Sequence, residues 1–289
     1  MLAVFIRELR AYFQGIIGFV FMGVFLLISG LFFTFMNLIA SSPEYNSVLG
    51  SITFIFLIVV PVLTMRLLSD ETRQKTDQLL LTSPTSLTGI VLGKYLAAQA
   101  VFVLTLVITF IYPFLLSTVT LGRLAMAHII GAYIGFFLLG SSFIAVGLFV
   151  SSLTDNQVIA FVVTAGALLL MWIIDFIQQA VPSDQTSGLI FAAILAALLT
   201  LFVYLTIRNI IVTVLVALAG AALIVVLFLT NAKAYEGLIV KVLQWFSLLR
   251  RYSDFNRGVL SLSPIVYYVS FCAAFIFLTV RVIEKRRWK

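Results

Sequence analysis

The chain has 289 residues, of which 63% are hydrophobic and only 10% are Asp, Glu, Lys or Arg, whereas ordinary soluble domains carry about 25% charged residues. This composition excludes a soluble globular protein. The formal net charge is +7, but the basic residues are scattered between apolar stretches and form no continuous face that would track phosphates, so nucleic acid is not expected as a partner.

Eight stretches without charged residues follow one another along the chain. They cover residues 11–43, 45–65, 95–122, 124–154, 156–174, 185–207, 209–232 and 258–280. Each can hold the roughly 17 to 25 apolar residues that a helix needs to cross the hydrocarbon core. Strands of outer-membrane barrels alternate lipid-facing with lumen-facing positions, and these solid runs do not. We therefore predict an all-α integral membrane protein, a bundle of about eight transmembrane helices that forms a single transmembrane domain over residues 1–289.

The amino-terminal segment 1–13 precedes the first predicted span. Arg7 and Arg10 fall at helical spacing opposite Phe5 and Leu9. A helix with one charged and one apolar face lies in the plane of the membrane interface. We expect an interfacial helix that leads into the first span.

The segment 66–94 follows the second predicted span. Ser69 is a candidate N-cap, Asp70 and Glu71 fall in the first turn, and Pro84 would end the helix. Because charges nearly ring this helix, it cannot enter the bilayer. Two interpretations are open: a solvated linker beneath the membrane, or a helix that docks on a cytosolic partner.

A third non-spanning segment, 233–262, precedes the last predicted span. Within it, polar residues recur in steps of three and four over 238–257, at Lys241, Gln244, Ser247, Arg251 and Asp254. The residues between them are mostly apolar. This period predicts an amphipathic helix that lies flat in the outer interface.

The distribution of basic residues predicts the orientation. With both termini in the cytoplasm, about twice as many Lys and Arg residues lie inside as outside, in agreement with the positive-inside rule.

The string GIVLGK at 89–94 is similar to a phosphate-binding loop but departs from it. Three residues separate the glycines where four are needed, and Tyr95 follows Lys94 where Ser or Thr is needed. We expect no nucleotide binding by this chain.

Few ionisable or nucleophilic groups lie in the spans. His128 and Cys272 are the sole residues of their types, which excludes a zinc-protease motif and a His–Cys dyad of neighbouring residues. Asp175 is either an intramembrane proton carrier or an interfacial cap. Without paired carboxylates or metal-binding clusters in the spans we expect no catalysis, and without a securely placed midplane charge we expect the energy for transport to come from elsewhere.

Glycine and proline mark special positions in the spans. Gly131 and Gly135 form a GxxxG pair, which permits either tight packing within the subunit or dimerisation. Pro61 and Pro113 are expected to kink their helices.

Four stretches resemble permease subunits of type-2 ABC exporters, in particular the gliding-motility-type permeases. They are FIRELRAYFQGIIGFVFMGVFLLISGLFF (5–33), TMRLLSDETRQKTDQLLLTSPTSLTGIVLGKYLAA (64–98), GLFVSSLTDNQVIAF (147–161) and FNRGVLSLSPIVYYVSFCAAFIFLTVRVIEKRRW (255–288). Their order along the chain makes the resemblance more specific than any single string.

The resemblance implies a complex in a bacterial-type cell membrane. Two permease subunits, identical or homologous, would bind two cytosolic ABC ATPase subunits that hold ATP and Mg, and an auxiliary extracytoplasmic protein is a further candidate partner. No catalytic, cofactor or metal residue is implied in this chain. The helix after span two would be the coupling helix that docks on the ATPase, through Asp70, Glu71, Arg73, Thr76, Asp77, Gln78, Leu79, Leu80 and Leu81. The family often has Gly, Thr, Leu and Glu where this chain has Lys75, Thr76, Asp77 and Gln78.

The function predicted from sequence is therefore that of an ABC exporter permease. The alternatives are a membrane anchor of a motility or secretion assembly that does not transport, and an ion-coupled secondary transporter.

Overall fold

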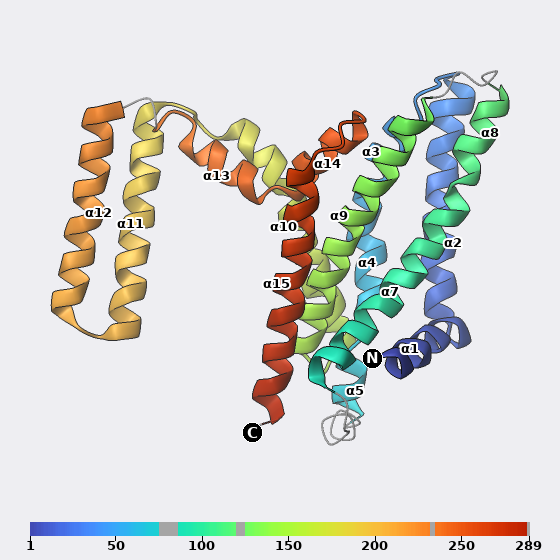
Figure 1. Cartoon of the computed structure of the whole chain (residues 1–289), viewed down its shortest axis with the longest axis horizontal. Coiled ribbons are helices and arrows are strands. Elements are labelled where there is room, and N and C mark those ends of the chain that lie inside the picture. The colour runs from blue at the N-terminus through green and yellow to red at the C-terminus, as the bar shows by residue number, and fades with distance from the viewer. Residues whose placement is uncertain (75–85, 120–124, 232–234, 288–289) are drawn as a thin grey trace. The chain divides into compact units, whose positions relative to one another are not determined.

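The computed structural model describes residues 1–74, 86–119, 125–231 and 235–287 (Figure 1). Every regular element in these ranges is a helix, and eight of the helices are long and apolar enough to cross a membrane. The eight cover Ile16–Ile39, Tyr45–Arg73, Leu87–Thr118, Met126–Leu153, Gln157–Gln178, Gln185–Thr206, Ile210–Thr230 and Leu262–Arg286. The predicted all-α bundle with about eight spans is therefore confirmed.

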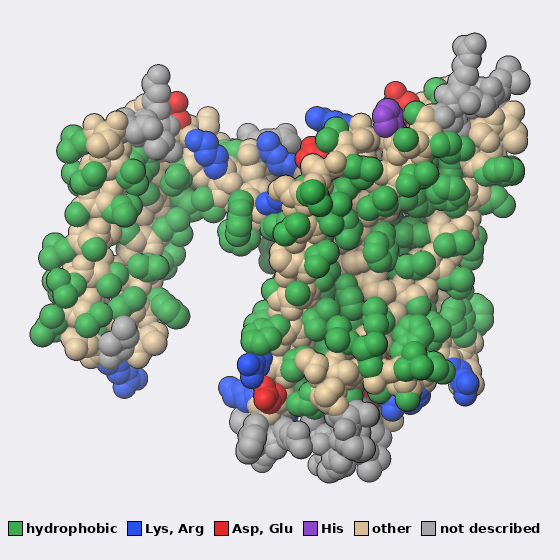
Figure 2. Space-filling view, viewed as in Figure 1, with side chains coloured by type: hydrophobic (Ala, Val, Ile, Leu, Met, Phe, Trp, Pro, Cys, Tyr) green, Lys and Arg blue, Asp and Glu red, His purple; other side chains and the backbone are tan. Residues whose placement is uncertain are grey.

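The chain divides into two compact units. The first comprises Met1–Trp172 and Leu248–Lys289, and the second comprises Ile173–Ser247. On the face of the first unit seen in Figure 2, apolar side chains cover the middle of the helices and charged side chains gather toward the two ends. Both termini lie at one end of this unit, here called the termini end (Figure 1).

The first unit begins with two helices at an angle. Helix α1 (Leu2–Gln14) and α2 (Ile16–Phe33) are separated by Gly15, which has extended backbone, and α2 continues into the π-helical η1 (Thr34–Ile39). Val4 and Tyr12 on α1 are buried. A helix that leads into the first span is therefore confirmed at the amino terminus, and its place at the membrane interface stays a prediction.

The second span consists of several pieces. Helix α3 (Tyr45–Ser51) leads through the 3₁₀ segment η2 (Ile52–Ile55) into α4 (Phe56–Thr64), and a turn then leads into the short α5 (Ser69–Arg73). Pro61 lies inside α4. Residues 75–85, which include most of the predicted coupling helix, lie outside the described residues.

The third span breaks near Pro113. Helix α7 (Leu87–Thr109) ends at Phe110, and α8 (Ile111–Val119) follows. Pro113 has no N–H to donate to the carbonyl of Thr109, one turn earlier, so the helix is interrupted there. The kink predicted from this proline is confirmed.

Helix α9 (Met126–Leu153) forms the centre of the first unit. It packs against α4, α7, α14 (Leu248–Asn256) and α15 (Leu262–Arg287). Its middle carries Phe136, whose ring centroid lies 4.7 Å from that of Phe56, and Phe102 lies 5.6 Å from Phe56. Such aromatic pairs add to the packing energy of the core.

The glycines of α9 provide room for its neighbours. A Cβ atom on Gly135 would clash with Phe255, one on Gly140 with Phe102, and one on Gly147 with Thr64. Gly135, the second glycine of the GxxxG pair, thus takes part in packing within the subunit.

The second unit holds the end of α10 (Gln157–Ala180) together with α11 (Gln185–Ile207), α12 (Ile210–Asn231) and α13 (Leu238–Phe246). Helices α11 and α12 form an antiparallel hairpin (Figure 1), which turns at Arg208 with φ of 51°. The side chain of Asp184 caps α11 by accepting a hydrogen bond from the backbone N–H of Ser187.

The single amphipathic helix predicted over 238–257 is wrong in detail. The chain forms two short helices, α13 and α14, because Ser247 has extended backbone. The Oγ of Ser247 donates to a carboxylate oxygen of Asp175 at 2.6 Å, so Ser247 does not belong to a water-facing polar stripe. In α14, moreover, Tyr252 and Phe255 are buried in the core, so this half packs on the bundle.

Asp175 is engaged by its neighbours. Its carboxylate accepts hydrogen bonds from Ser247 and from the side-chain amide of Gln178. These bonds agree with the cap interpretation from the sequence.

Candidate functional site

Charged residues from three helices meet at the termini end of the first unit. The side chain of Lys94 on α7 is 1% exposed, and its Nζ lies 3.0 Å from Oε1 of Glu8 on α1 and 2.9 Å from Oε1 of Glu71 on α5. The guanidinium of Arg7 contacts the same two carboxylates, at 2.6 and 2.8 Å. We call Arg7, Glu8, Glu71 and Lys94 the Lys94 cluster. Two cations and two anions make it neutral overall.

The string GIVLGK is explained by this cluster. It lies inside α7 and forms no loop. A Cβ atom on Gly93 would lie 3.0 Å from Cβ of Val4 and from the carbonyl oxygen of Met1, and Gly89 also faces Met1. The two glycines therefore let α1 pack closely on α7, which brings Glu8 to Lys94. The lysine is committed to carboxylates of its own chain.

The cluster also determines the charge of Glu8. Burial alone would raise the pKa of Glu8, but the Lys94 ammonium and the Arg7 guanidinium outweigh burial and hold this pKa below its ordinary value. Burial alone would likewise lower the pKa of Arg7, and the carboxylates of Glu8 and Glu71 raise it. Glu8 and Arg7 on α1 are therefore both charged at neutral pH.

A second set of contacts joins the turn between α4 and α5 to α9. The Oγ of Ser151 accepts hydrogen bonds from the backbone N–H groups of Leu68 and Ser69, both at 3.1 Å, and donates to the carbonyl of Met65 at 3.2 Å. A hydroxyl has one proton and two lone pairs, so all three bonds are compatible. This one side chain satisfies the backbone at the start of α5.

The N-cap predicted for α5 is accordingly wrong. Ser69 is the first residue of the helix, Leu68 occupies the N-cap position, and no side chain of the cap bonds the helix. The Oγ of Ser69 instead donates to the carbonyl of Met65. Because the chain already turns helically after α4, Ser69 lies inside the first turn, and Ser151 provides the acceptor from outside.

Helix α5 has two further anchors. The carboxylate of Asp70 accepts from Gln157 Nε2 at 2.6 Å and pairs with Arg66 at 2.9 Å. Thr72 accepts from the guanidinium of Arg286 on α15 at 3.1 Å. The short helix is thus tied to α1, α7, α9, α10 and α15.

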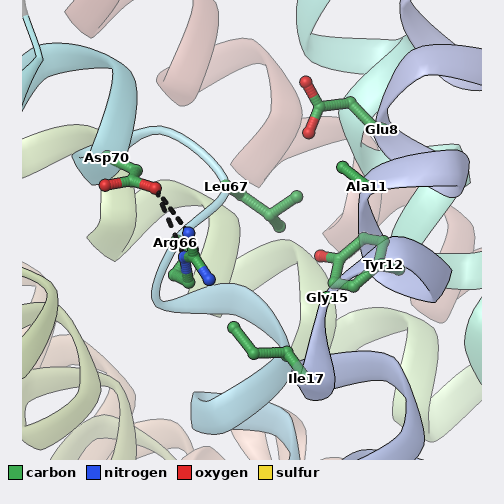
Figure 3. A pocket seen from close by; sticks show the side chains of 8 residues that line it. All are labelled: Glu8, Ala11, Tyr12, Gly15, Ile17, Arg66, Leu67 and Asp70. Carbon is green, nitrogen blue, oxygen red and sulfur yellow. Dashed lines mark hydrogen bonds and ion pairs between the residues drawn. The ribbon is translucent and has the colours of Figure 1, made fainter.

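A small cavity separates α5 from α1 (Figure 3). Its volume is about 120 Å³, and its walls are Glu8, Ala11, Tyr12, Gly15, Ile17, Arg66, Leu67 and Asp70. Figure 3 shows Arg66 and Asp70, joined by hydrogen bonds, on one side and Glu8 on the other. A polar cavity of this size has room for a few water molecules.

The predicted coupling positions thus differ in their surroundings. The side chains of Asp70 and Glu71 are 19% and 16% exposed and are bonded within the chain. Arg73 is exposed and lines a hollow of about 540 Å³ with Thr154, Asp155, Asn156 and Ile159. Thr76, Asp77, Gln78, Leu79, Leu80 and Leu81 lie outside the described residues.

Sequence reasoning did not identify Ser151 and Gln157 as partners of α5. Both lie in GLFVSSLTDNQVIAF, one of the stretches that carried the family resemblance. Gly147 and Ser151 stand four residues apart, on one face of α9, and contact Thr64 and Met65 respectively. Small residues at this spacing in an apolar span are a signal for a close helix contact.

The chain matches a known protein family. The family described as ABC-2 family transporter protein matches residues 14–181, which is more than half of the chain. The matched region includes α5, Ser151 and Gln157. Among curated proteins, no match was found.

Proposed function

The chain belongs to the ABC-2 transporter family, and we propose that it is the permease subunit of an ATP-driven exporter. It would form the translocation path with a second permease subunit. Two cytosolic ABC ATPase subunits would bind ATP and Mg and supply the energy, and α5 with the residues after it would be the coupling helix.

The anchoring of α5 is the observation that supports this proposal. Five residues of helix are joined to α1 and α7 by ion pairs, to α9 and α10 by hydrogen bonds, and to α15 through Arg286. A force applied to α5 from the termini end therefore reaches five other helices directly. A solvated linker needs no such connections.

The same geometry suggests which residues would meet the ATPase. Since Asp70 and Glu71 bond within the chain, their part in coupling is to hold α5 in place. Arg73 and the hollow that it shares with Thr154 and Asp155 are open. We propose this hollow, together with residues 76–81, as the docking surface.

The experiment is to co-express the chain with its ATPase subunit and to measure co-purification, ATP hydrolysis and substrate movement into vesicles. Reversing charge by Arg73→Glu should uncouple hydrolysis from transport while the fold is retained, because Arg73 is exposed. Arg208→Glu, which changes another exposed arginine in the α11–α12 turn, is the matched control.

Each alternative function has its own outcome. Stable co-purification with hydrolysis but without substrate movement would indicate an anchor. Transport that persists without the ATPase subunit and collapses with the ion gradient would indicate a secondary transporter. Either result would contradict the proposal.

We also propose that the termini end faces the cytoplasm of a bacterial-type cell. The test is cysteine labelling with an impermeant reagent, in a background with Cys272→Ser. Asp254→Cys should react in intact cells, and Arg208→Cys only after the membrane is opened. The reverse pattern would invert the orientation.

A further inference from the structure

A groove between α7, α9 and α15 has a polar floor that the proposed coupling function does not use. Its volume is about 750 Å³, within the range of small-molecule sites. We call it the α15 groove. Its walls are mainly apolar and include Leu92, Leu96, Phe137, Val269, Ile276 and Phe277. Val269 and Phe277 are more than half exposed, so the groove opens on the surface of the first unit.

Gln99 forms part of the floor and is not fully bonded. The residue is 6% exposed. The Oγ of Ser141 lies 3.0 Å from Oε1 of Gln99 and 2.7 Å from the carbonyl oxygen of Phe137, but a hydroxyl has a single proton to donate. Nε2 of Gln99 has no partner among the described residues. The hydroxyl of Tyr95, which also lines the groove, interacts with the Gln99 side chain, but it donates its proton to the carbonyl of Ser141 at 3.1 Å.

An unpaired amide group is costly in apolar surroundings. A ligand in the α15 groove with an uncharged hydrogen-bonding group at this level would remove that cost. A hydroxyl suits both orientations of the amide, because it donates and accepts.

The end of the groove carries a charged group. Arg281 lines it, has a side chain that is 60% exposed, and pairs with Glu284 at 2.7 Å. Exposed pairs of this kind contribute little energy and exchange readily. An anionic group of a ligand could therefore take the place of Glu284 on Arg281.

Helix α15 gives the distance between the level of Gln99 and the level of Arg281. Sγ of Cys272 lies 3.5 Å from Oγ of Ser142, so Cys272 is level with the floor around Ser141. Arg281 follows nine residues later on α15, which corresponds to about 13 Å along a helix. A ligand that reaches both points needs its two polar groups about that far apart.

We propose that the α15 groove binds an elongated amphiphile with an anionic head at Arg281 and an uncharged hydroxyl or amide group, on an otherwise apolar chain, at Gln99. Ordinary glycerophospholipids carry their ester groups next to the head, so they do not reach both points. The binding requires neither ATP nor an ATPase subunit, so it stands apart from the proposed transport function.

The test uses the full chain in phosphatidylcholine nanodiscs, without nucleotide. A photoreactive stearate is cross-linked to the protein, and its adducts on α7 and α15 are mapped by mass spectrometry. Three competitors are compared: stearate, 12-hydroxystearate and 2-hydroxystearate. In an extended chain, carbon 12 lies at about the required distance from the carboxylate.

We expect 12-hydroxystearate to compete roughly tenfold better than the other two, the gain from one neutral hydrogen bond in an apolar site. Gln99→Leu should abolish this preference and leave stearate unchanged. Gln14→Leu, on the exposed side of α1, should retain it, and Arg281→Gln should weaken all three competitors alike.

Equal competition by the three acids for the wild-type protein would overturn the proposal, and this comparison does not depend on any variant that folds. So would a preference for 12-hydroxystearate that survives Gln99→Leu. Efficient disulfide-linked dimers of Val269→Cys in the Cys272→Ser background would show instead that a second copy of the chain covers the groove.

Discussion

Replacing Lys94 with Met would leave the Lys94 cluster with one cation and two carboxylates. Removing one partner of a buried ion pair costs about 3–5 kcal/mol. Arg7 still contacts both carboxylates, but its side chain is 52% exposed, so it compensates only in part. We expect Lys94→Met to lower the free energy of unfolding by about 3 kcal/mol, at the lower end of that range.

The matched change is Glu71→Gln, which leaves one surplus positive charge. Lys94 keeps Glu8 as a partner at 3.0 Å, and the new amide retains an oxygen that accepts, so the loss should be about 1–2 kcal/mol. The double variant Lys94→Met with Glu71→Gln is neutral again. Because the two residues are in contact, its loss should fall short of the sum of the single losses by about 1–2 kcal/mol.

The assay is thermal unfolding of the purified chain in one fixed lipid or detergent. At about 2 °C per kcal/mol for a chain of this size, Lys94→Met should lower Tm by about 6 °C, and the double variant by clearly less than both singles combined. Lys285→Met, an exposed change at the same end, should have no effect.

Strictly additive losses in the double variant would refute the assignment of Glu71 to an internal ion pair. The loss expected for the double variant is therefore about that of Lys94→Met alone, because Glu71→Gln costs little once Lys94 is gone.

Four other predictions follow from the same contacts. Ser151→Ala removes the acceptor for two backbone N–H groups and should lower the free energy of unfolding by about 1–3 kcal/mol. The control Ser152→Ala loses only a bond to the carbonyl of Phe149 and should cost less. Equal losses in the two variants would contradict the role of Ser151. Gly147→Ala should lower Tm, because the new Cβ meets Thr64 on α4. The control Gly166→Ala meets nothing within 4 Å and should raise the free energy of unfolding by up to about 1 kcal/mol. An unchanged Tm in Gly147→Ala would show that α9 can move away from α4. The pKa of Glu8 in the folded state lies below the ordinary value of 4.5. Its contribution to the free energy of unfolding is therefore present above pH 4.5 and is lost as the pH falls through the folded-state pKa. Hydrogen exchange in α1 should rise over this pH range in the wild type but not in Glu8→Gln. Lys94→Ala should leave the ATP affinity of an assembled complex unchanged, and loss of nucleotide binding with intact assembly would contradict the assignment of GIVLGK to helix packing.

The spans were predictable because lipid imposes a simple requirement. A helix in hydrocarbon must be apolar for about 20 residues, and this requirement is visible in every charge-free run of the sequence. The break before Pro113 was predictable for a similar reason, since the missing N–H is a local property. Neither inference needs to know which helices are neighbours.

The ion pairs of Lys94 were not predictable, because they join residues that are far apart in the chain. Glu8 and Lys94 are 86 residues apart, and each was counted among the residues outside the hydrocarbon core. The helical period over 238–257 failed for the same reason. Ser247 fits the polar stripe, but its hydrogen-bond partner Asp175 lies 72 residues earlier in the chain. A periodic pattern contains no information about such a distant partner.

The ion pair between Glu8 and Lys94 also constrains the order of biosynthesis. A ribosome adds about 5–20 residues per second, so the partner of Glu8 emerges several seconds after α1 has been made. Before α7 has been inserted, α1 can already pack on α2 and bond to the carbonyl of Leu63 through Tyr12, but Glu8 has no Lys94 to pair with. Formation of this ion pair therefore requires that the third span is in place. A bulky amino-terminal fusion that keeps α1 away from α7 would leave the buried Lys94 without Glu8, and Glu71 would be its remaining carboxylate partner.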